Sequence, residues 1–147
     1  MRKTERKLKP KQARKPGNCY EYAFRAILNN PGQKSPLEAW LDENGSLPSS
    51  NNRDIVVVHG TVTGAGGSVA GRQYGHAWCE VRVGRRWFVV DCGTLQPLFT
   101  LFPRQQYYEA GHIKPSECQR YDVVEACRLG AESNHYGPWD DRCEGNK

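Results

Sequence analysis

The stretch that decides the fold is HAWCEVRVGRRWFVVDC, residues 76–92. Two runs rich in strand-forming residues flank Gly84-Arg85, and a short glycine-containing break between such runs predicts a β-hairpin. A two-residue turn at this point fixes the pairing register of both strands. Because side chains alternate along a strand, His76 and Asp91 then fall on one face of the hairpin as diagonal neighbours.

The segments on either side of the hairpin predict an α+β fold. Asn18 is a favoured N-cap residue, and Glu21 stands where the acid of a capping box reaches back. The expected helices are Cys19–Leu28, Ser35–Glu43, Pro103–Ala110 and Asp122–Leu129, the last two closed by Gly111 and Gly130, and the expected strands are Ile55–Val58, His76–Val83 and Arg86–Cys92. We expect the N-terminal helix to pack on a small antiparallel sheet.

The positive charge is concentrated at the start of the chain. The formal net charge is +5, yet residues 1–16 contain eight Lys or Arg and one acid, which leaves the remainder slightly acidic. We expect residues 1–16 to form a disordered basic leader and residues 17–147 to form a single domain. Such a leader makes at most weak, non-specific contact with nucleic acid.

Targeting signals and cysteine usage indicate a compartment. No stretch has the apolar length of a membrane span, and no apolar h-region follows the basic start. The sequence therefore predicts a cytoplasmic protein with no membrane partner. Its six cysteines form no C-x-x-C pair, so we expect free thiols, no metal site and no cofactor. Cys79 and Cys92 fall on the face of the hairpin away from His76 and are expected in the core.

Three side chains of the predicted fold have the chemistry of a catalytic triad. Cys19 stands at the first position of a helix, where the positive end of the helix dipole stabilises a thiolate. His76 would act as general base and acid, and Asp91 would hold its tautomer. We therefore predict Cys19, His76 and Asp91 as catalytic residues, with Asn18 as a candidate donor to the oxyanion.

Other assignments stay open from the residues alone. His59, Tyr74 and Trp78 are candidates for lining a substrate cleft. A metal-dependent hydrolase using His59, His76 and Asp91 is an alternative enzyme. The alternative from another class is a catalytically inactive binding module whose basic tail contacts nucleic acid.

A family resemblance supports the cysteine-enzyme interpretation. The segment His76-Ala77-Trp78-Cys79-Glu80-Val81, followed by Gly84, Trp87 and Val90-Asp91, resembles the core of the transglutaminase-like cysteine enzymes. The resemblance covers Gly17–Leu28 and Tyr74–Thr94. It implies a papain-like fold with Cys19 as nucleophile, His76 as general base and acid, and Asp91 as the residue that orients it. The chain departs from the pattern at Cys92, where proline is usual, and no Trp follows Cys19 directly.

The same resemblance implies an acyl transfer on an amide of a protein or peptide substrate, without a cofactor. A peptide bond, an isopeptide bond and a glutamine side chain remain open as substrates, and we expect hydrolysis rather than cross-linking. The segments Val57–Gly64 and His135–Asp140 resemble a branch found in bacteria and their phages, which implies no particular activity. The sequence does not indicate an oligomeric state.

Overall fold

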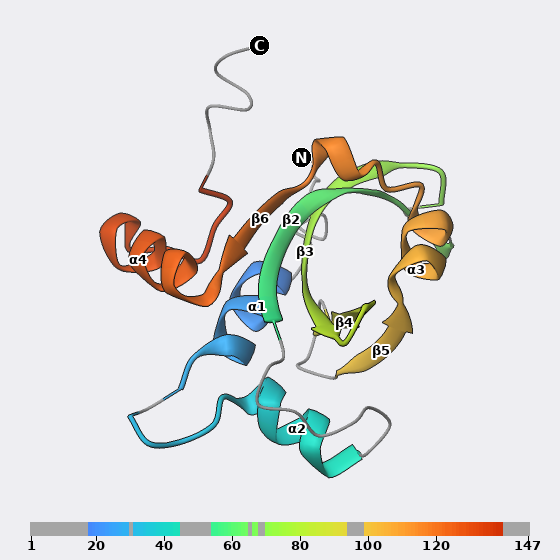
Figure 1. The fold of residues 1–147 in the computed structure, drawn as a ribbon. Coiled ribbons are helices and arrows are strands. Elements are labelled where there is room, and N and C mark those ends of the chain that lie inside the picture. Colours follow the sequence, from blue (N-terminus) through green and yellow to red (C-terminus); the bar gives the residue numbers. More distant parts are fainter. Residues whose placement is uncertain are drawn as a thin grey trace.

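The fold is α+β, as the sequence predicts. The computed structural model describes residues 18–29, 31–44, 54–64, 66–67, 70–93 and 99–139; the leader of residues 1–16, the expected loop Ser46–Arg53 and Cys143 lie outside them. The helices of the described part are α1 (Cys19–Ile27), α2 (Pro36–Asn44), α3 (Arg104–Gly111) and α4 (Val123–Ser133), and the strands are β2 (Asp54–Thr63), β3 (Gln73–Val83), β4 (Arg86–Asp91), β5 (Thr100–Pro103) and β6 (Gln119–Asp122) (Figure 1). None of these helices is long and apolar enough to cross a membrane.

The five strands form one antiparallel sheet in the order β5-β4-β3-β2-β6. The predicted hairpin register is confirmed, because Val83 pairs with Arg86 and the ladder runs on to Cys79 and Val90. Gly84 takes a φ of +67° in the turn, a left-handed conformation that glycine adopts without strain. The register therefore puts His76 and Asp91 on the same face of the sheet.

The two outermost strands, β5 and β6, were not expected from the sequence. Each is four residues long, and β6 reads Gln-Arg-Tyr-Asp, in which Tyr121 is the one buried side chain. Short polar strands at a sheet edge carry little hydrophobic signal. The strand predicted over Ile55–Val58 is longer in the structure and continues through His59 to Thr63, because β2 is central and pairs on both sides.

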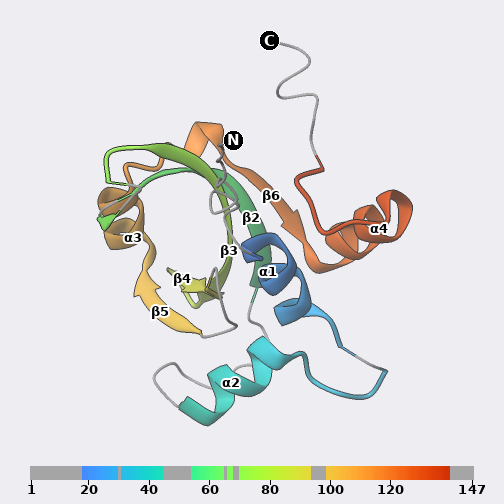
Figure 2. The same cartoon turned by 180° about the vertical axis from the view of Figure 1, so that it is seen from behind.

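The sheet is strongly curved, and its two faces carry separate cores (Figures 1 and 2). On the concave side, α3 packs against Val58, Trp78 and Val89. On the convex side, α1 lies across β2 and β3, as Figure 2 shows, and packs against apolar residues that include Ala77, Cys79 and Val81. The expected packing of the N-terminal helix on the sheet is therefore present, and α3 covers the opposite face.

Helix boundaries agree with the sequence to within a few residues, with corrections at the caps. The helix α2 begins after Ser35, whose hydroxyl accepts a hydrogen bond from the Glu38 amide at 3.2 Å. The expectation that Gly130 closes the last helix is wrong, since α4 continues to Ser133 and ends at Asn134 in a left-handed conformation. Likewise, α3 ends at left-handed His112, one residue beyond Gly111.

The capping box expected at α1 does not form. Asn18 is the N-cap residue, but its backbone has φ −117° and ψ 34°, and its side chain makes no capping hydrogen bond. Glu21 pairs instead with Arg25, one turn along the helix, at 2.7 Å. The start of α1 is therefore held by packing of its buried face and not by its N-cap side chain.

Candidate active site

Cys19 is the first residue of α1 and is completely buried. The buried side of the helix consists of Cys19, Ala23, Phe24, Ala26 and Ile27. The sulfur of Cys79 on β3 lies 3.5 Å from the carbonyl oxygen of Ala23, so the helix packs directly on the sheet. The position of Cys19 thus follows from the apolar spacing of α1.

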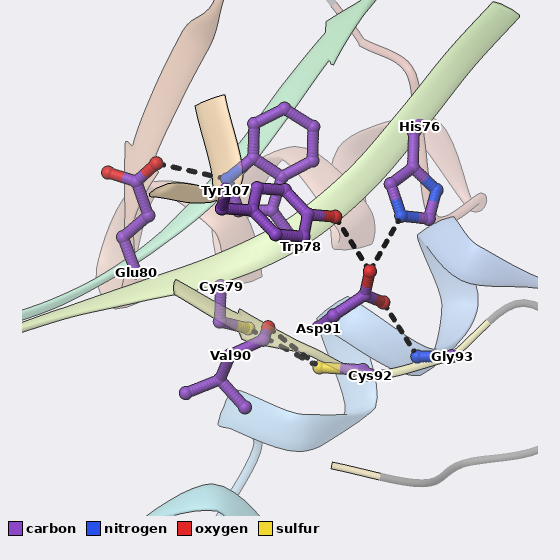
Figure 3. Close-up of polar contacts among 9 residues, drawn as sticks. All are labelled: His76, Trp78, Cys79, Glu80, Val90, Asp91, Cys92, Gly93 and Tyr107. Atoms are coloured by element: carbon purple, nitrogen blue, oxygen red, sulfur yellow. Dashed lines mark hydrogen bonds and ion pairs between the residues drawn. The ribbon is translucent and has the colours of Figure 1, made fainter. Parts of the chain in front are cut away.

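His76 and Asp91 are brought together by the hairpin. The imidazole Nε2 of His76 lies 3.4 Å from Oδ2 of Asp91, as Figure 3 shows. The paired part of the ladder ends at Cys79 and Val90. His76 therefore lies on β3 beyond the end of its pairing with β4. Asp91 and Cys19, at the start of α1, come close to the imidazole there.

Asp91 is held by two further hydrogen bonds. The hydroxyl of Tyr107 donates to Oδ2 at 2.6 Å, and the backbone amide of Gly93 donates to Oδ1 at 3.0 Å (Figure 3). Burial alone would raise the pKa of the Asp91 carboxyl, but the hydrogen bonds from His76, Tyr107 and Gly93 outweigh it and lower that pKa to about 2. Asp91 is therefore a carboxylate at neutral pH.

His76 is almost fully buried and interacts with both Asp91 and Cys19. Burial of the ring disfavours the imidazolium, but the interactions with Asp91 and Cys19 outweigh burial and raise the pKa of His76 to about 9. Nδ1 of His76 makes no hydrogen bond within the described residues. The Cys19 thiol lies close enough to the imidazole to raise its pKa, and an imidazole nitrogen left without a partner is common in catalytic sites without substrate.

The two aromatic cleft candidates on β3 differ in accessibility. Trp78 has no exposed surface, so it packs beneath the surface and cannot line a cleft. The expectation that Trp78 lines a substrate cleft is therefore wrong. Its indole N–H donates to the carboxylate of Glu80 at 3.0 Å, and its ring lies 5.8 Å from that of His76. Tyr74 is partly exposed, with its ring centroid 6.2 Å from that of His76, so it can contact a substrate beside the imidazole.

His59 does not join His76 and Asp91. It pairs with Ala77 across the β2–β3 ladder and so points to the convex face, opposite to His76. There its ring is enclosed by Tyr20, Tyr121 and Trp139 at centroid distances of 4.8 to 5.1 Å. Burial lowers the pKa of His59 to about 4. The expectation of His59 in the cleft is therefore wrong, as is the metal site of His59, His76 and Asp91.

Asn18 is exposed and directly precedes Cys19. Since its side chain does not cap α1, its amide is not committed to the helix. In the residues that the structure describes, no group of three or more His, Cys, Asp or Glu side chains is arranged to hold a metal ion.

Sequence reasoning missed two residues that organise the site. Tyr107 is a direct partner of Asp91, to which its hydroxyl donates a hydrogen bond. Glu80 is fully buried and binds Trp78, Tyr108, Arg104 and Arg120. The contacts of Asp91 and Glu80 with the tyrosines of α3 depend on where that helix packs, so no local sequence pattern predicts them.

Comparison with known proteins identifies no relative: no family model, curated protein or solved structure matches this chain. The function of this chain is therefore inferred from the geometry of the site.

Proposed function

We propose that the chain is a cysteine-dependent enzyme that transfers an acyl group from an amide to water, with Cys19 as nucleophile, His76 as general base and acid, and Asp91 as the residue that orients the imidazole. The observation that carries the proposal is a buried imidazole that lies 3.4 Å from a carboxylate and also interacts with the cysteine at the start of α1. An antiparallel sheet with a cysteine-bearing helix on it is also compatible with a papain-like, transglutaminase-like core.

The proposed reaction begins from a charge-separated pair. With its pKa raised to about 9, His76 favours the imidazolium form at neutral pH, and a neighbouring Cys19 can supply that proton and become the thiolate. The thiolate attacks the amide carbonyl carbon, and the tetrahedral oxyanion accepts a hydrogen bond from the Cys19 amide at the helix start, with Asn18 as a second candidate donor.

Collapse of the tetrahedral intermediate breaks the C–N bond and leaves a thioester on Cys19. His76 gives its proton to the departing amine and then, as neutral imidazole, removes a proton from the attacking water. The second tetrahedral intermediate expels the Cys19 thiolate and releases a carboxylic acid, and His76 is again protonated. A protein or peptide substrate fits this chemistry, and the bond is a peptide, isopeptide or glutamine side-chain amide.

The experiment that tests the proposal is trapping of the thioester. The protein is incubated with peptides bearing each of the three amide types, quenched in acid and mapped by mass spectrometry, with and without a primary amine. We expect an acyl adduct on the peptide containing Cys19, which is absent from Cys19→Ala, and release of free acid without added amine. An unmodified Cys19 with every amide type would contradict the proposal.

One observation favours a second candidate, a catalytically inactive binding module: Cys19 has no exposed surface, so a substrate reaches it only after neighbouring groups move. This module would bind nucleic acid through residues 1–16, and its affinity would fall steeply with salt and vanish when they are deleted. Salt-sensitive nucleic-acid binding together with no thioester on Cys19 would select the binding module.

A further inference from the structure

Asp91 has a side-chain partner beyond those that the three-residue mechanism requires. The Tyr107 hydroxyl donates to Oδ2 at 2.6 Å, and this oxygen is also the one that faces Nε2 of His76 at 3.4 Å (Figure 3). The Gly93 amide occupies Oδ1 at 3.0 Å. Both oxygens of the carboxylate are thus fixed by groups outside the His76–Asp91 pair.

We propose that Tyr107 is a positioning residue of this site, whose hydroxyl sets the rotation of the Asp91 carboxylate so that Oδ2 stays directed at His76. The inference rests on the proposed function for its importance to turnover. The hydrogen bond from Tyr107 to Asp91 exists whether or not Cys19 is a nucleophile. It extends the chain of interacting side chains from Cys19, His76 and Asp91 to Tyr107.

The hydroxyl has few other roles that would explain its position. The Tyr107 ring packs against Trp78 and Phe102 at centroid distances of 5.5 and 5.4 Å, contacts that a phenylalanine ring would keep. Burial and the nearby Asp91 carboxylate raise the pKa of the Tyr107 phenol, so it remains a protonated donor across the physiological range. Its hydroxyl therefore acts on Asp91 and its ring on the core.

The helix α3 supplies a matched comparison at the next residue. The Tyr108 hydroxyl donates to the fully buried carboxylate of Glu80 on β3. Two consecutive tyrosines thus hold carboxylates on two adjacent strands, and only that of Tyr107 belongs to the site. Removing either hydroxyl costs one hydrogen bond to a carboxylate, and removing that of Tyr108 also costs the one it accepts from Arg120 at 2.6 Å. A fall in the pKa of His76 that is confined to the Tyr107 variant is therefore not a general effect of losing a tyrosine hydroxyl.

Without the Tyr107 hydroxyl, Gly93 is the only group outside the pair, among the described residues, that holds the Asp91 carboxylate, and it does so through Oδ1. The carboxylate is then free to rotate about its Cβ–Cγ bond, and its average interaction with His76 weakens. Among the described residues, the other titratable groups near this pair are the Cys19 thiol, which also favours the imidazolium, and two groups that stay neutral. These are the Tyr74 phenol, whose pKa is raised by burial, and the Cys79 thiol, whose pKa is raised by its hydrogen bond with Cys92 and by burial. Asp91 therefore remains the carboxylate on which the imidazolium depends.

The experiment is an NMR titration of the His76 imidazole, assigned with His76→Gln, in the full-length protein and in Tyr107→Phe. We expect the pKa of His76 to fall by about one pH unit in Tyr107→Phe and to stay unchanged in Tyr108→Phe. In an Asp91→Asn background, Tyr107→Phe should produce no further fall. An unchanged pKa, a rise, or an equal fall in Tyr108→Phe would overturn the proposal.

A second measurement decides the matter if Tyr107→Phe does not fold. In the unaltered protein, the Tyr107 hydroxyl proton should be protected from exchange and shifted downfield, and this signal should be absent in Asp91→Ala. No such proton in the folded protein would overturn the proposal. Failure of the proposed function is distinguishable, because an unreactive Cys19 leaves these NMR results unchanged.

Discussion

Nε2 of His76 lies 3.4 Å from Oδ2 of Asp91, a residue 15 positions further along the chain and on the neighbouring strand. The contact is diagonal across the hairpin, just beyond the last ladder pair of Cys79 and Val90. The imidazolium of His76 and the carboxylate of Asp91 stabilise each other, so the stability of the fold should depend on pH.

Replacing Asp91 with Asn should destabilise the protein in a defined pH window. The raised pKa of His76 means that its stabilising contribution is complete below 6.5 and is lost as pH rises through about 9. The lowered pKa of Asp91 means that its contribution is present above 3.8 and is lost as pH falls through about 2. We therefore expect Asp91→Asn to reduce the free energy of unfolding by about 2 kcal/mol at pH 7.

Chemical denaturation at several pH values checks this prediction. The difference between the original protein and Asp91→Asn should shrink at pH 10, where His76 is neutral in both. A difference that is the same at pH 7 and pH 10 would show that the His76–Asp91 charge interaction does not contribute. His76→Gln is the control, and its loss of stability should follow the same pH dependence.

The buried Glu80 carboxylate should be among the most sensitive positions outside the triad. It binds the Trp78 indole, the Tyr108 hydroxyl and two arginines, Arg104 and Arg120. Because Glu80→Ala leaves these partners without their acceptor, it should cost about 3–5 kcal/mol of unfolding free energy.

The matched control is Asp54→Ala, which breaks an exposed pair with Arg82 and should cost about 1 kcal/mol or less. Similar losses in denaturant unfolding would contradict the importance assigned to Glu80.

Gly60 should tolerate no side chain, because a Cβ built there lies 2.9 Å from both the Trp78 ring and the Cys118 sulfur. Trp78 is fully buried and cannot retreat, so Gly60→Ala should lower stability by about 1–3 kcal/mol. Gly66→Ala, where nothing lies within 4 Å of the added Cβ, is the control. Equal melting temperatures for the two variants would show that the concave core is loosely packed.

The hairpin could be predicted because its information is local. The alternation of side chains and the glycine turn determine which residues share a face, and the register from Val83 and Arg86 to Cys79 and Val90 agrees with that expectation. The buried, free thiols of Cys79 and Cys92, with sulfurs 3.9 Å apart, also follow from this register. These features depend on neighbours in sequence or on a two-residue turn.

The remaining features depend on contacts between distant segments. Tyr107 reaches Asp91, and Arg120 approaches Glu80, only because α3 and β6 pack where they do. His59 was misplaced because the predicted strand ended at Val58; the continued pairing of β2 turns His59 to the convex face. Neither the edge strands nor the buried charge network has a periodic signal, so the sequence predicted that His76 and Asp91 share a face of the sheet but not which residues support them.

The most direct test of the central claim is selective alkylation of Cys19. Cys19 has no exposed surface, so iodoacetamide reaches it through the same movement of neighbouring groups that would admit a substrate. With limiting iodoacetamide at pH 7, followed by peptide mapping, we expect the thiol of Cys19 to be modified first in folded protein, because His76 interacts with it. Burial raises the pKa values of the Cys118 and Cys127 thiols and, together with the neighbouring Cys92 thiol, that of Cys79, so these should react slowly.

His76→Ala should slow the alkylation of Cys19 about tenfold, since the imidazolium that stabilises the thiolate is lost. Rates in 6 M guanidinium, where burial no longer limits access, serve as the reference for both proteins. Selective modification of Cys19 that depends on His76 is the result we predict. Modification of Cys118 or Cys127 while Cys19 stays untouched, or a Cys19 rate unaffected by His76→Ala, would contradict the claim that this chain has a cysteine–histidine catalytic pair.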